Sequence, residues 1–584
     1  MGETSGSGSG RSNEFRAYLS QDWKQWITEY PELATSMGLP GLNDRWTDDS
    51  QAGIERRRRH LADSRSRLQR FDRATVATED RLTYDMYRGL LDTADAGLRF
   101  GHDPLPFCFG SPRNLWMPLH QLEGIHILAS DMAELQPRAC SSDYGDLLVR
   151  LRTLPDAIEQ NRVLLEKGLA GGYSPPRVAM VGVPDQITNL TPADPFASPL
   201  LKPFSDFPAA IGESERSRLR AEARTLFVDR VAPALGGLRG YLESTYVPAC
   251  RESIARAALP NGAESYDFLV QWTTTTDLTP RQIHEIGTAE VQRIRASLEA
   301  LMAKTGFKGS FAEFKRFLRE DPRFSWTSAE DLVDGYRIIA KKIDPTLGRL
   351  FGRLPRLPYG VVPVPQFREA TSPTAYYQSG APATGRAGNF FVNTFQVGIR
   401  PRWEMEALTL HESVPGHHLQ IAVAQELEHL PEFRKETGPT AFAEGWGLYA
   451  ESLGEELGFY QDPYSKIGQL TFDMWRSIRL VVDTGMHALG WSRDRAIEFF
   501  RENTGMSDVG IQVEVDRYIV WPAQALAYKI GQLKIRELRT YAEGRLGGRF
   551  DVRGFHDVVL GEGALPLRDL ETRVKAWVEA RAAA

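Results

Sequence analysis

The sequence predicts a mainly α-helical protein, and three observations support this. Apolar residues recur at three- and four-residue spacing, with charged residues between them, over 215–256, 281–304, 466–501 and 523–545. Alternating patterns that are typical of strands are few. Hydrophobic residues make up 42% of the 584 residues and charged residues 25%, which is ordinary for a globular protein with a large core.

The composition argues against several classes of protein. The net charge is −6, so no basic surface for nucleic acid is expected. No run of about 18 apolar residues exists, so no membrane span is expected. The three cysteines are too few and too scattered for a disulfide framework. Because the N-terminus lacks an apolar signal segment, the expected location is cytoplasmic as written, or periplasmic or secreted if an export signal was removed.

The domain organisation is expected to be simple. The GSGSG run near the start has the composition of a flexible linker, so residues 1–12 are predicted to form a flexible tail. Residues 13–584 are predicted to form a single unit. Proline-rich interruptions at 174–207 and 353–373 predict long loops between its helices.

One glycine-rich segment, residues 376–399, departs from the helical pattern. It becomes β-favouring from Asn389 to Thr394, and Pro401 then precedes a helix that runs to His411. The free edge of such a strand can pair with an extended peptide, so Asn389 is expected to contact substrate. The alternative is a plain surface hairpin.

The stretch HESVPGHHLQ, residues 411–420, indicates metal chemistry. The zinc signature H-E-x-x-H places two histidines four residues apart on one helical face. Here His411 and His417 are six apart, which is about 120° out of phase on a regular helix. His411 and His418 are seven apart, with about 10.5 Å of rise between them. Neither pair can hold one zinc at about 2.0–2.1 Å from a regular helix.

Pro415 and Gly416 offer a solution to this mismatch. Proline has no N–H and its ring clashes with the carbonyl four residues earlier, while glycine adopts dihedrals that a bulge requires. A two-residue bulge would bring His417 to the place of the second histidine, so His411 and His417 are the predicted ligands. His418 is the alternative ligand if the bulge is larger, and otherwise a substrate-binding or supporting group.

Three glutamates complete the predicted site. Glu412 directly follows the first ligand and is expected to act as the base that takes a proton from water. Glu444 and Glu451 lie two turns apart on one face of a later helix. Glu444, flanked by the small residues Ala443 and Gly445, is the predicted third ligand of one zinc ion per chain. Glu451 is expected to hold a histidine N–H, although an exposed helical glutamate is the alternative for both.

The chain resembles the bacterial family known as domain of unknown function 885 in the stretches PELATSMGLPGLNDRW, HESVPGHHLQ, AFAEGWGLYAE, VVDTGMHALGW and YIVWPAQALAYKIGQLKI. The resemblance covers about residues 14–580. Members are regarded as metal-dependent peptidases, distantly similar to thimet oligopeptidase, angiotensin-converting enzyme and carboxypeptidase Taq. It implies a large two-lobed helical body with a deep cleft, a short strand or small sheet beside the metal helix, and catalytic segments within about 376–535. The chain departs from the H-E-x-x-H of those relatives by its inserted residues.

The resemblance also implies a tyrosine downstream of the metal helices that stabilises the tetrahedral intermediate. Tyr528 is the preferred candidate and Tyr518 the second. A phenol O–H can donate to a developing oxyanion without changing its own charge. A core tyrosine is the alternative for each.

Further residues in the same region are candidates for binding substrate. Lys529, Arg386 and Gln524 could receive the terminal carboxylate of a peptide. His487 lies four residues after Asp483 on another helix. The two either line the cleft or form a buried structural pair.

These observations predict a zinc-dependent peptidase that hydrolyses short peptides, with Glu412 as general base. Exopeptidase action, as a carboxypeptidase or dipeptidyl carboxypeptidase, is the first expectation. One alternative is a metal-dependent amidase acting on a modified amino acid or natural product. Another is a catalytically inactive peptide-binding protein, against which the presence of Glu412 argues. Short peptides are the expected partners, without nucleic acid or membrane, and no oligomeric state is predicted.

Overall fold

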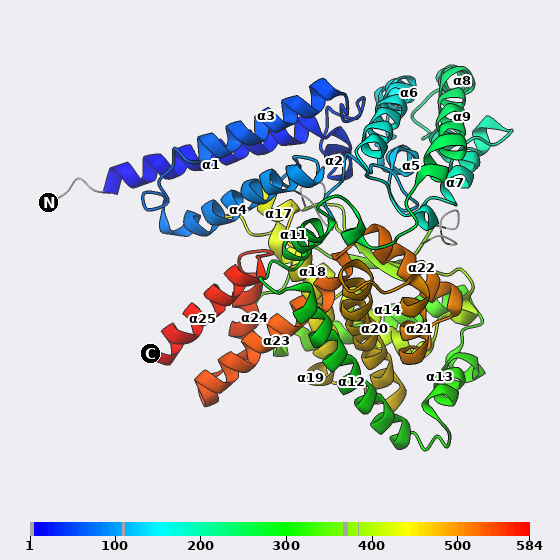
Figure 1. Cartoon of the computed structure of the whole chain (residues 1–584). Helices are drawn as coiled ribbons and strands as arrows, with labels where there is room; N and C mark the ends of the chain where they lie inside the picture. Colours follow the sequence, from blue (N-terminus) through cyan, green and yellow to red (C-terminus); the bar gives the residue numbers. More distant parts are fainter. Residues whose placement is uncertain (1–4, 108–110, 366–368, 370–371, 383–384, 584) are drawn as a thin grey trace. The chain divides into compact units, whose positions relative to one another are not determined.

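The structure is a computed structural model that describes residues 5–107, 111–365, 369, 372–382 and 385–583 (Figure 1). It is mainly α-helical, as the sequence predicts. The chain divides after Ala263 into two compact units. Among the described residues, no helix is long and apolar enough to cross a membrane.

The first unit is built from helices, of which α5 to α9 contribute apolar side chains to one buried core. Its helices are α1 (Ser5–Glu29), α2 (Pro31–Ser36), α3 (Gln51–Leu68), α4 (Arg81–Gly97), α5 (Ile125–Leu135), α6 (Ser141–Ala170), α7 (Val183–Leu190), α8 (Glu213–Leu226), α9 (Ala232–Tyr241) and α10 (Val247–Ala249). Helices α8 to α10 lie where the sequence predicts a helix over 215–256, but they end at Ala249. They are joined by π-helical turns at Phe227–Val231 and Leu242–Tyr246.

The N-terminal segment differs from its prediction. Helix α1 begins at Ser5, so the described part of the predicted tail, residues 5–12, is helical. Residues 1–4 lie outside the described part. Glycine and serine favour helices weakly, but adding residues to a helix that already exists avoids the unfavourable nucleation step.

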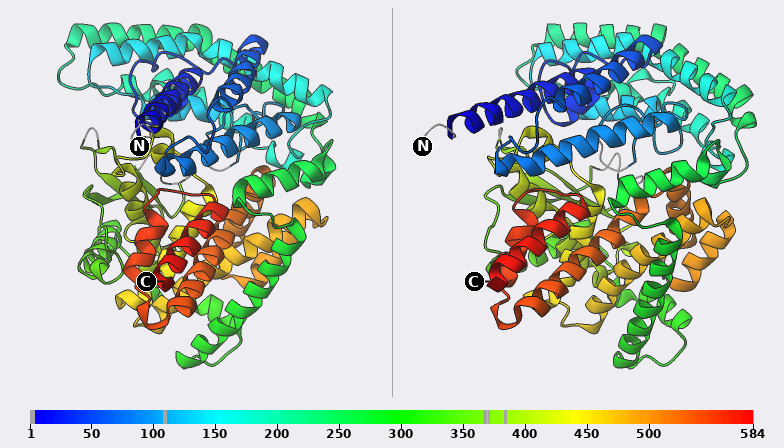
Figure 2. Two further views of the ribbon diagram at one scale, coloured as in Figure 1. Left: turned by 90° about the vertical axis from the view of Figure 1, so that its left-hand side faces the viewer. Right: turned by 60° about the vertical axis from the view of Figure 1, so that its left-hand side comes forward.

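The second unit carries the predicted site. Its helices are α11 (Gly262–Thr274), α12 (Pro280–Lys304), α13 (Phe311–Glu320), α14 (Ala329–Ile343), α15 (Met405–Glu412), α16 (His417–Gln425), α17 (Glu432–Glu436), α18 (Thr440–Ser452), α19 (Gly454–Leu457), α20 (Pro463–Ala488), α21 (Arg493–Asn503), α22 (Asp508–Val520), α23 (Ala527–Leu546), α24 (Val552–Leu560) and α25 (Leu567–Ala583). Helix α12 packs along α20, and α18 along α23. Both views of Figure 2 show α23 and α25, in orange-red and red, side by side.

Helix α20 lies at the centre of this unit. Nearly all of its residues from Ile467 to His487 are buried, as expected for a helix that is covered on every side. The predicted helix of residues 466–501 is interrupted after Ala488. Gly490 has a left-handed φ of 72° there, which favours glycine and ends the helix before α21 begins.

A small sheet accompanies the helices of the second unit. Its strands are β1 (Tyr359–Pro363), β2 (Ala375–Gln378) and β3 (Gly388–Val392), in the order β1-β3-β2. Strand β3 is parallel to β1 and antiparallel to β2. The predicted strand is therefore the middle strand. The expectation that it offers a free edge to a peptide is wrong, because both of its edges are already paired.

Candidate metal centre

The chain breaks its helix between the predicted ligands. Helix α15 ends at Glu412 and α16 begins at His417, with a turn between them. A Cβ atom on Gly416 would lie 1.9 Å from the carbonyl oxygen of His411, so glycine is required for space. Its φ of −78° is not left-handed. The structure thus contains a break between two helices where the sequence predicts a bulge within one.

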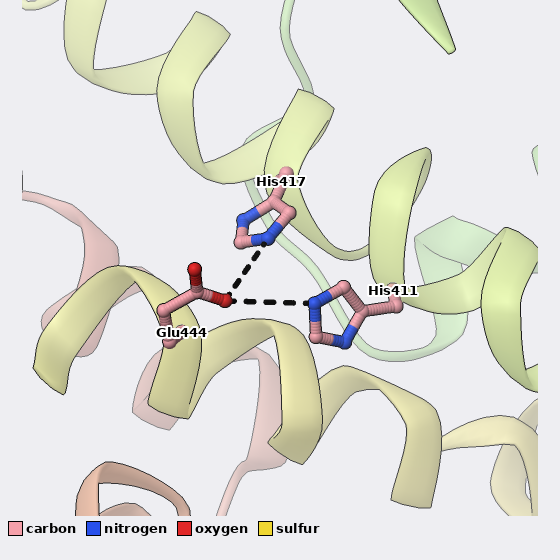
Figure 3. Close-up of side chains that lie close together, drawn as sticks. All are labelled: His411, His417 and Glu444. Atoms are coloured by element: carbon pink, nitrogen blue, oxygen red, sulfur yellow. Dashed lines mark ion pairs between the residues drawn. The ribbon is translucent and has the colours of Figure 1, made fainter. Parts of the chain in front are cut away.

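The break turns two imidazoles toward one carboxylate of α18, as Figure 3 shows. His411 Nε2 lies 3.7 Å and His417 Nε2 lies 3.5 Å from Glu444 Oε2. One ligand atom of each residue lies within 4.8 Å of the other two. Tetrahedral zinc with bonds of about 2.0–2.1 Å spaces its ligand atoms roughly 3.4 Å apart. These three residues, called the metal cluster below, therefore fit a zinc ion with little movement.

Two other residues of α18 set the orientation of His411. Glu451 Oε1 lies 2.8 Å from His411 Nδ1, the contact that the sequence predicts. This hydrogen bond leaves Nε2 to face Glu444. Gly447 lies beneath the imidazole, where a Cβ atom would come within 2.8 Å of Cε1 of His411. Sequence reasoning missed Gly447, although its place three residues after Glu444 puts it on the same helical face.

The electrostatics of the cluster suit a cation. Burial would lower the pKa of His411, but the carboxylates of Glu444 and Glu451 outweigh burial and raise this pKa to about 9. Burial would raise the pKa of Glu444, but His411 and His417 hold it well below its usual range. The cluster thus favours a negative carboxylate beside imidazoles whose protons a metal ion can displace.

His418 points away from the cluster and toward the sheet. Its Nδ1 lies 2.9 Å from the hydroxyl of Tyr377, and its Nε2 lies 3.1 Å from the carbonyl oxygen of Leu357. Its ring packs against Tyr359, with 4.6 Å between centroids. Burial lowers the pKa of His418 to about 4. Because both nitrogens are engaged, its geometry supports neither the ligand role nor the substrate-binding role, and the residue attaches α16 to the sheet.

Glu412, the predicted base, and Tyr528, the preferred tyrosine, each have a polar group without a hydrogen-bond partner among the described residues. Glu412 is largely buried beside His411, and among the described residues its carboxylate has no hydrogen-bond partner. Tyr528 is 9% exposed, and its ring centroid lies 4.5 Å from Cζ of Arg479 and 5.8 Å from Cζ of Arg476. No hydrogen bond to the hydroxyl of Tyr528 occurs within the described part of the chain.

Tyr518 has no such freedom. Its hydroxyl donates to Glu514 at 2.5 Å and accepts hydrogen bonds from Arg479 and Trp475 at 2.8 and 3.2 Å. A phenol that is fully bonded in the core cannot also donate to a substrate oxyanion. The prediction for Tyr518 is therefore not supported by its geometry.

The prediction that Lys529 binds a substrate carboxylate is wrong. Its side chain is fully buried, and its ammonium contacts Asp473 at 2.5 Å, Glu290 at 2.8 Å and Gln532 at 2.8 Å. An ammonium group has three N–H donors, and these three partners use all of them.

His487 and Asp483 are structural as well. His487 is buried, and its Nε2 lies 2.9 Å from the carbonyl oxygen of Tyr518, so the prediction that it contacts substrate is wrong. Asp483 accepts hydrogen bonds from the hydroxyl of Tyr266 and from the backbone N–H of Ala523. Asp483 and His487 are therefore both buried structural residues, which is the alternative to their lining a cleft.

The three remaining candidates lie apart from the cluster. Gln524 accepts a hydrogen bond of 2.7 Å from Arg517. Arg386 is exposed just before β3, and Asn389 is half-buried within β3. In the described residues, none of the three side chains contacts the metal cluster.

Comparisons with known proteins agree on family and fold. A family described as "Bacterial protein of unknown function (DUF885)" matches residues 31–574. A "putative lipoprotein" from Colwellia psychrerythraea has a similar crystal structure, with a TM-score of 0.89, 26% sequence identity, and coverage of 98% of this chain and 99% of that chain. A "putative lipoprotein of unknown function" from Shewanella oneidensis shares the fold, with a TM-score of 0.70, 15% identity, and coverage of 97% and 99%. No curated protein matches the chain.

Proposed function

The chain belongs to the bacterial family of unknown function DUF885, and from its site we propose that it is a zinc-dependent peptidase that hydrolyses short peptides. The observation that carries the proposal is the convergence of His411, His417 and Glu444 beside the free carboxylate of Glu412. Two imidazoles and one carboxylate leave the fourth position of tetrahedral zinc open, which is typical of catalytic zinc.

The residues around the cluster have distinct roles in this proposal. A zinc ion held there would supply the Lewis acidity that lowers the pKa of water and polarises a peptide carbonyl. Glu412 takes the proton from the attacking water and passes it to the leaving amine. Tyr528 donates its O–H to the carbonyl oxygen as negative charge develops there. Glu451 keeps His411 in the tautomer and orientation that a ligand needs.

We further propose exopeptidase action of the carboxypeptidase type, with one zinc per chain. An amidase acting on a modified amino acid would use the same residues, and only substrate profiling separates the two. The lipoprotein description of the 26%-identical relative favours the cell envelope over the cytoplasm as the location.

Metal analysis and peptide profiling test the proposal together. Purified protein should hold about one zinc per chain and cleave members of a mixed peptide library read by mass spectrometry, whereas His411→Ala should lose both properties. Glu412→Gln should keep zinc and melting temperature while its rate falls by about 10²- to 10⁴-fold. Full zinc loading in His411→Ala would contradict the metal site, and near-normal turnover in Glu412→Gln would remove that residue from the mechanism.

A further inference from the structure

Arg476 on the central helix α20 is a buried cation with unmet hydrogen-bond donors. It is 6% exposed, yet its Nε and Nη1 have no hydrogen-bond partner among the residues that the structure describes. Its Nη2 lies 3.9 Å from Glu451 Oε1, beyond hydrogen-bond distance, and that oxygen already bonds His411. The buried Arg150, by contrast, donates hydrogen bonds from its Nε, Nη1 and Nη2. Unmet donors on a buried charge are costly, so the position of Arg476 favours a ligand.

Arg479, three residues later, adds a further unmet donor to the same place. Its Nε and Nη2 donate to Tyr518 and Glu514, while its Nη1 has no hydrogen-bond partner in the described part of the chain. The guanidinium groups of Arg476 and Arg479 both lie close to the ring of Tyr528, at 5.8 and 4.5 Å. The unmet N–H groups thus gather around the tyrosine that is proposed to act on substrate.

The charge balance leaves this group positive. Three guanidinium groups, those of Arg476, Arg479 and Arg517, face two carboxylates, those of Glu514 and Glu451. Glu514 lies 3.2 Å from Arg479 and 3.5 Å from Arg517, so one carboxylate is shared between two guanidinium groups. The carboxylate of Glu404 also interacts electrostatically with Arg476. Burial raises the pKa of Glu404 to about 7, so this carboxyl group is partly neutral at neutral pH. A further anion is therefore favoured beside Arg476.

We propose that Arg476 and Arg479, together with Tyr528, form a subsite that binds a carboxylate of the substrate beside the metal cluster. The proposal rests on the peptidase function and narrows its substrates to peptides with a carboxylate near the scissile bond. Guanidinium groups suit this role because their planar N–H donors match the geometry of a carboxylate. Glu451, between Arg476 and His411, separates the subsite from the cluster by a single side chain.

The carboxylate has two sources, which matched peptides distinguish. The first pair is one peptide with a free C-terminus and the same peptide with a C-terminal amide. The second pair, both amidated, carries Glu or Gln beside the scissile bond. The subsite predicts that kcat/KM for the acid of one pair exceeds that for its neutral partner by about 10- to 1,000-fold.

Arg476→Met tests the residue itself. It should bring that ratio close to one, mainly by raising KM for the acid peptide, while zinc content stays unchanged. Arg493→Met is the control, because Arg493 is paired with Asp516 on a neighbouring helix, outside the subsite. It should keep the wild-type ratio.

Two outcomes would overturn the subsite while leaving the peptidase function intact. One is a wild-type ratio near one for both pairs. The other is an equal loss for acid and neutral peptides in Arg476→Met together with loss of zinc, which would mean that Arg476 acts only through Glu451.

If the wild-type protein cleaves no peptide, the proposed function fails. Binding of small carboxylates, measured by calorimetry, then tests the subsite independently of catalysis. Phenylacetate should bind more tightly than its neutral isostere phenylacetamide, by about tenfold or more. The difference should persist in His411→Ala, which excludes anion binding by the metal, and disappear in Arg476→Met. Equal binding of the two probes would overturn the subsite.

Discussion

His411 shows how closely single residues define the site. One ring nitrogen bonds Glu451 and the other faces Glu444, while Gly447 leaves room beneath the ring. All three partners come from one face of α18, so the ring is held from one side only. The other side is left to the second histidine, His417, whose ring is nearly perpendicular to it at 89°.

The two adjacent histidines should respond differently to substitution. His417→Ala should abolish zinc binding, because it removes a nitrogen 3.5 Å from Glu444 Oε2. His418→Ala should keep zinc and lower stability, because it removes contacts to Tyr377 and Leu357. Zinc stoichiometry and melting temperature check both variants, and retained zinc in His417→Ala with loss in His418→Ala would reverse the assignment.

The space beneath His411 provides a second test at this scale. Gly447→Ala places a Cβ atom 2.8 Å from the imidazole. It should displace the ring and weaken zinc binding by about 10-fold or more, as expected for a misplaced ligand. The matched control is Gly544→Ala on the open side of α23, where no atom lies within 4 Å. The control should keep zinc and gain up to about 1 kcal/mol of stability. Equal zinc affinity in the two variants would contradict the packing argument.

At the scale of elements, α20 fixes the turn that precedes α23. Asp483 of α20 accepts the backbone N–H of Ala523, a residue with a left-handed φ of 69°. Ala523 begins the turn that leads to Tyr528, so this contact helps place the proposed oxyanion donor.

Helix α18 likewise holds the break between α15 and α16, because Trp446 Nε1 donates to the carbonyl oxygen of Pro415 at 2.8 Å.

The burial of Asp483 makes the stability of the fold depend on pH. Burial raises the pKa of Asp483 to about 7, so the folded state favours the protonated acid. The contribution of Asp483 is therefore fully present below about pH 4 and is lost as pH rises to about 7, by up to about 1.4 kcal/mol per pH unit. Asp483→Asn, which resembles the neutral acid, should lack this loss. Melting temperatures of both proteins from pH 4 to 8 check it, and a constant difference between them would contradict the raised pKa.

At the scale of the whole molecule, the proposed chemistry belongs to one of the two compact units. The metal cluster, Glu412, Tyr528 and the arginine subsite all lie after residue 264. Within the described residues, no other group of three metal-binding side chains is found. Metal binding should therefore stabilise the chain through the second unit.

Zinc should raise the melting temperature of chelator-treated protein. Free zinc at about 100 times its dissociation constant adds about 2.7 kcal/mol to the free energy of unfolding when it binds only the folded state. His411→Ala should show no such increase. Calorimetric scans with and without zinc measure this, and an equal increase in both proteins would place the binding elsewhere.

Local sequence patterns predict the helical class, which the structure confirms, and they predict the residues of the metal cluster. Helical spacing is a local property, so Glu412 beside His411 and Glu451 two turns after Glu444 are recognised from nearby residues. The meeting of α15 and α18, which brings Glu444 and Glu451 to His411, is a tertiary contact. Sequence left the choice between His417 and His418 open. That choice depends on the helix break, and the tertiary contact between Trp446 and Pro415 helps to hold the break.

Roles that depend on distant partners become visible only in the folded chain. From the sequence, Lys529 is expected to be free to bind substrate. In the structure it forms ion pairs with Asp473 of α20 and Glu290 of α12. The sequence predicts β3 as a strand with a free edge, but in the structure it lies between β1 and β2. In the sequence Arg476 resembles any other helical arginine. The binding role proposed for it rests on its burial without a hydrogen-bond partner among the described residues. The burial of a side chain and the partners that it contacts depend on residues far away in the sequence. A local pattern in the chain therefore does not predict them.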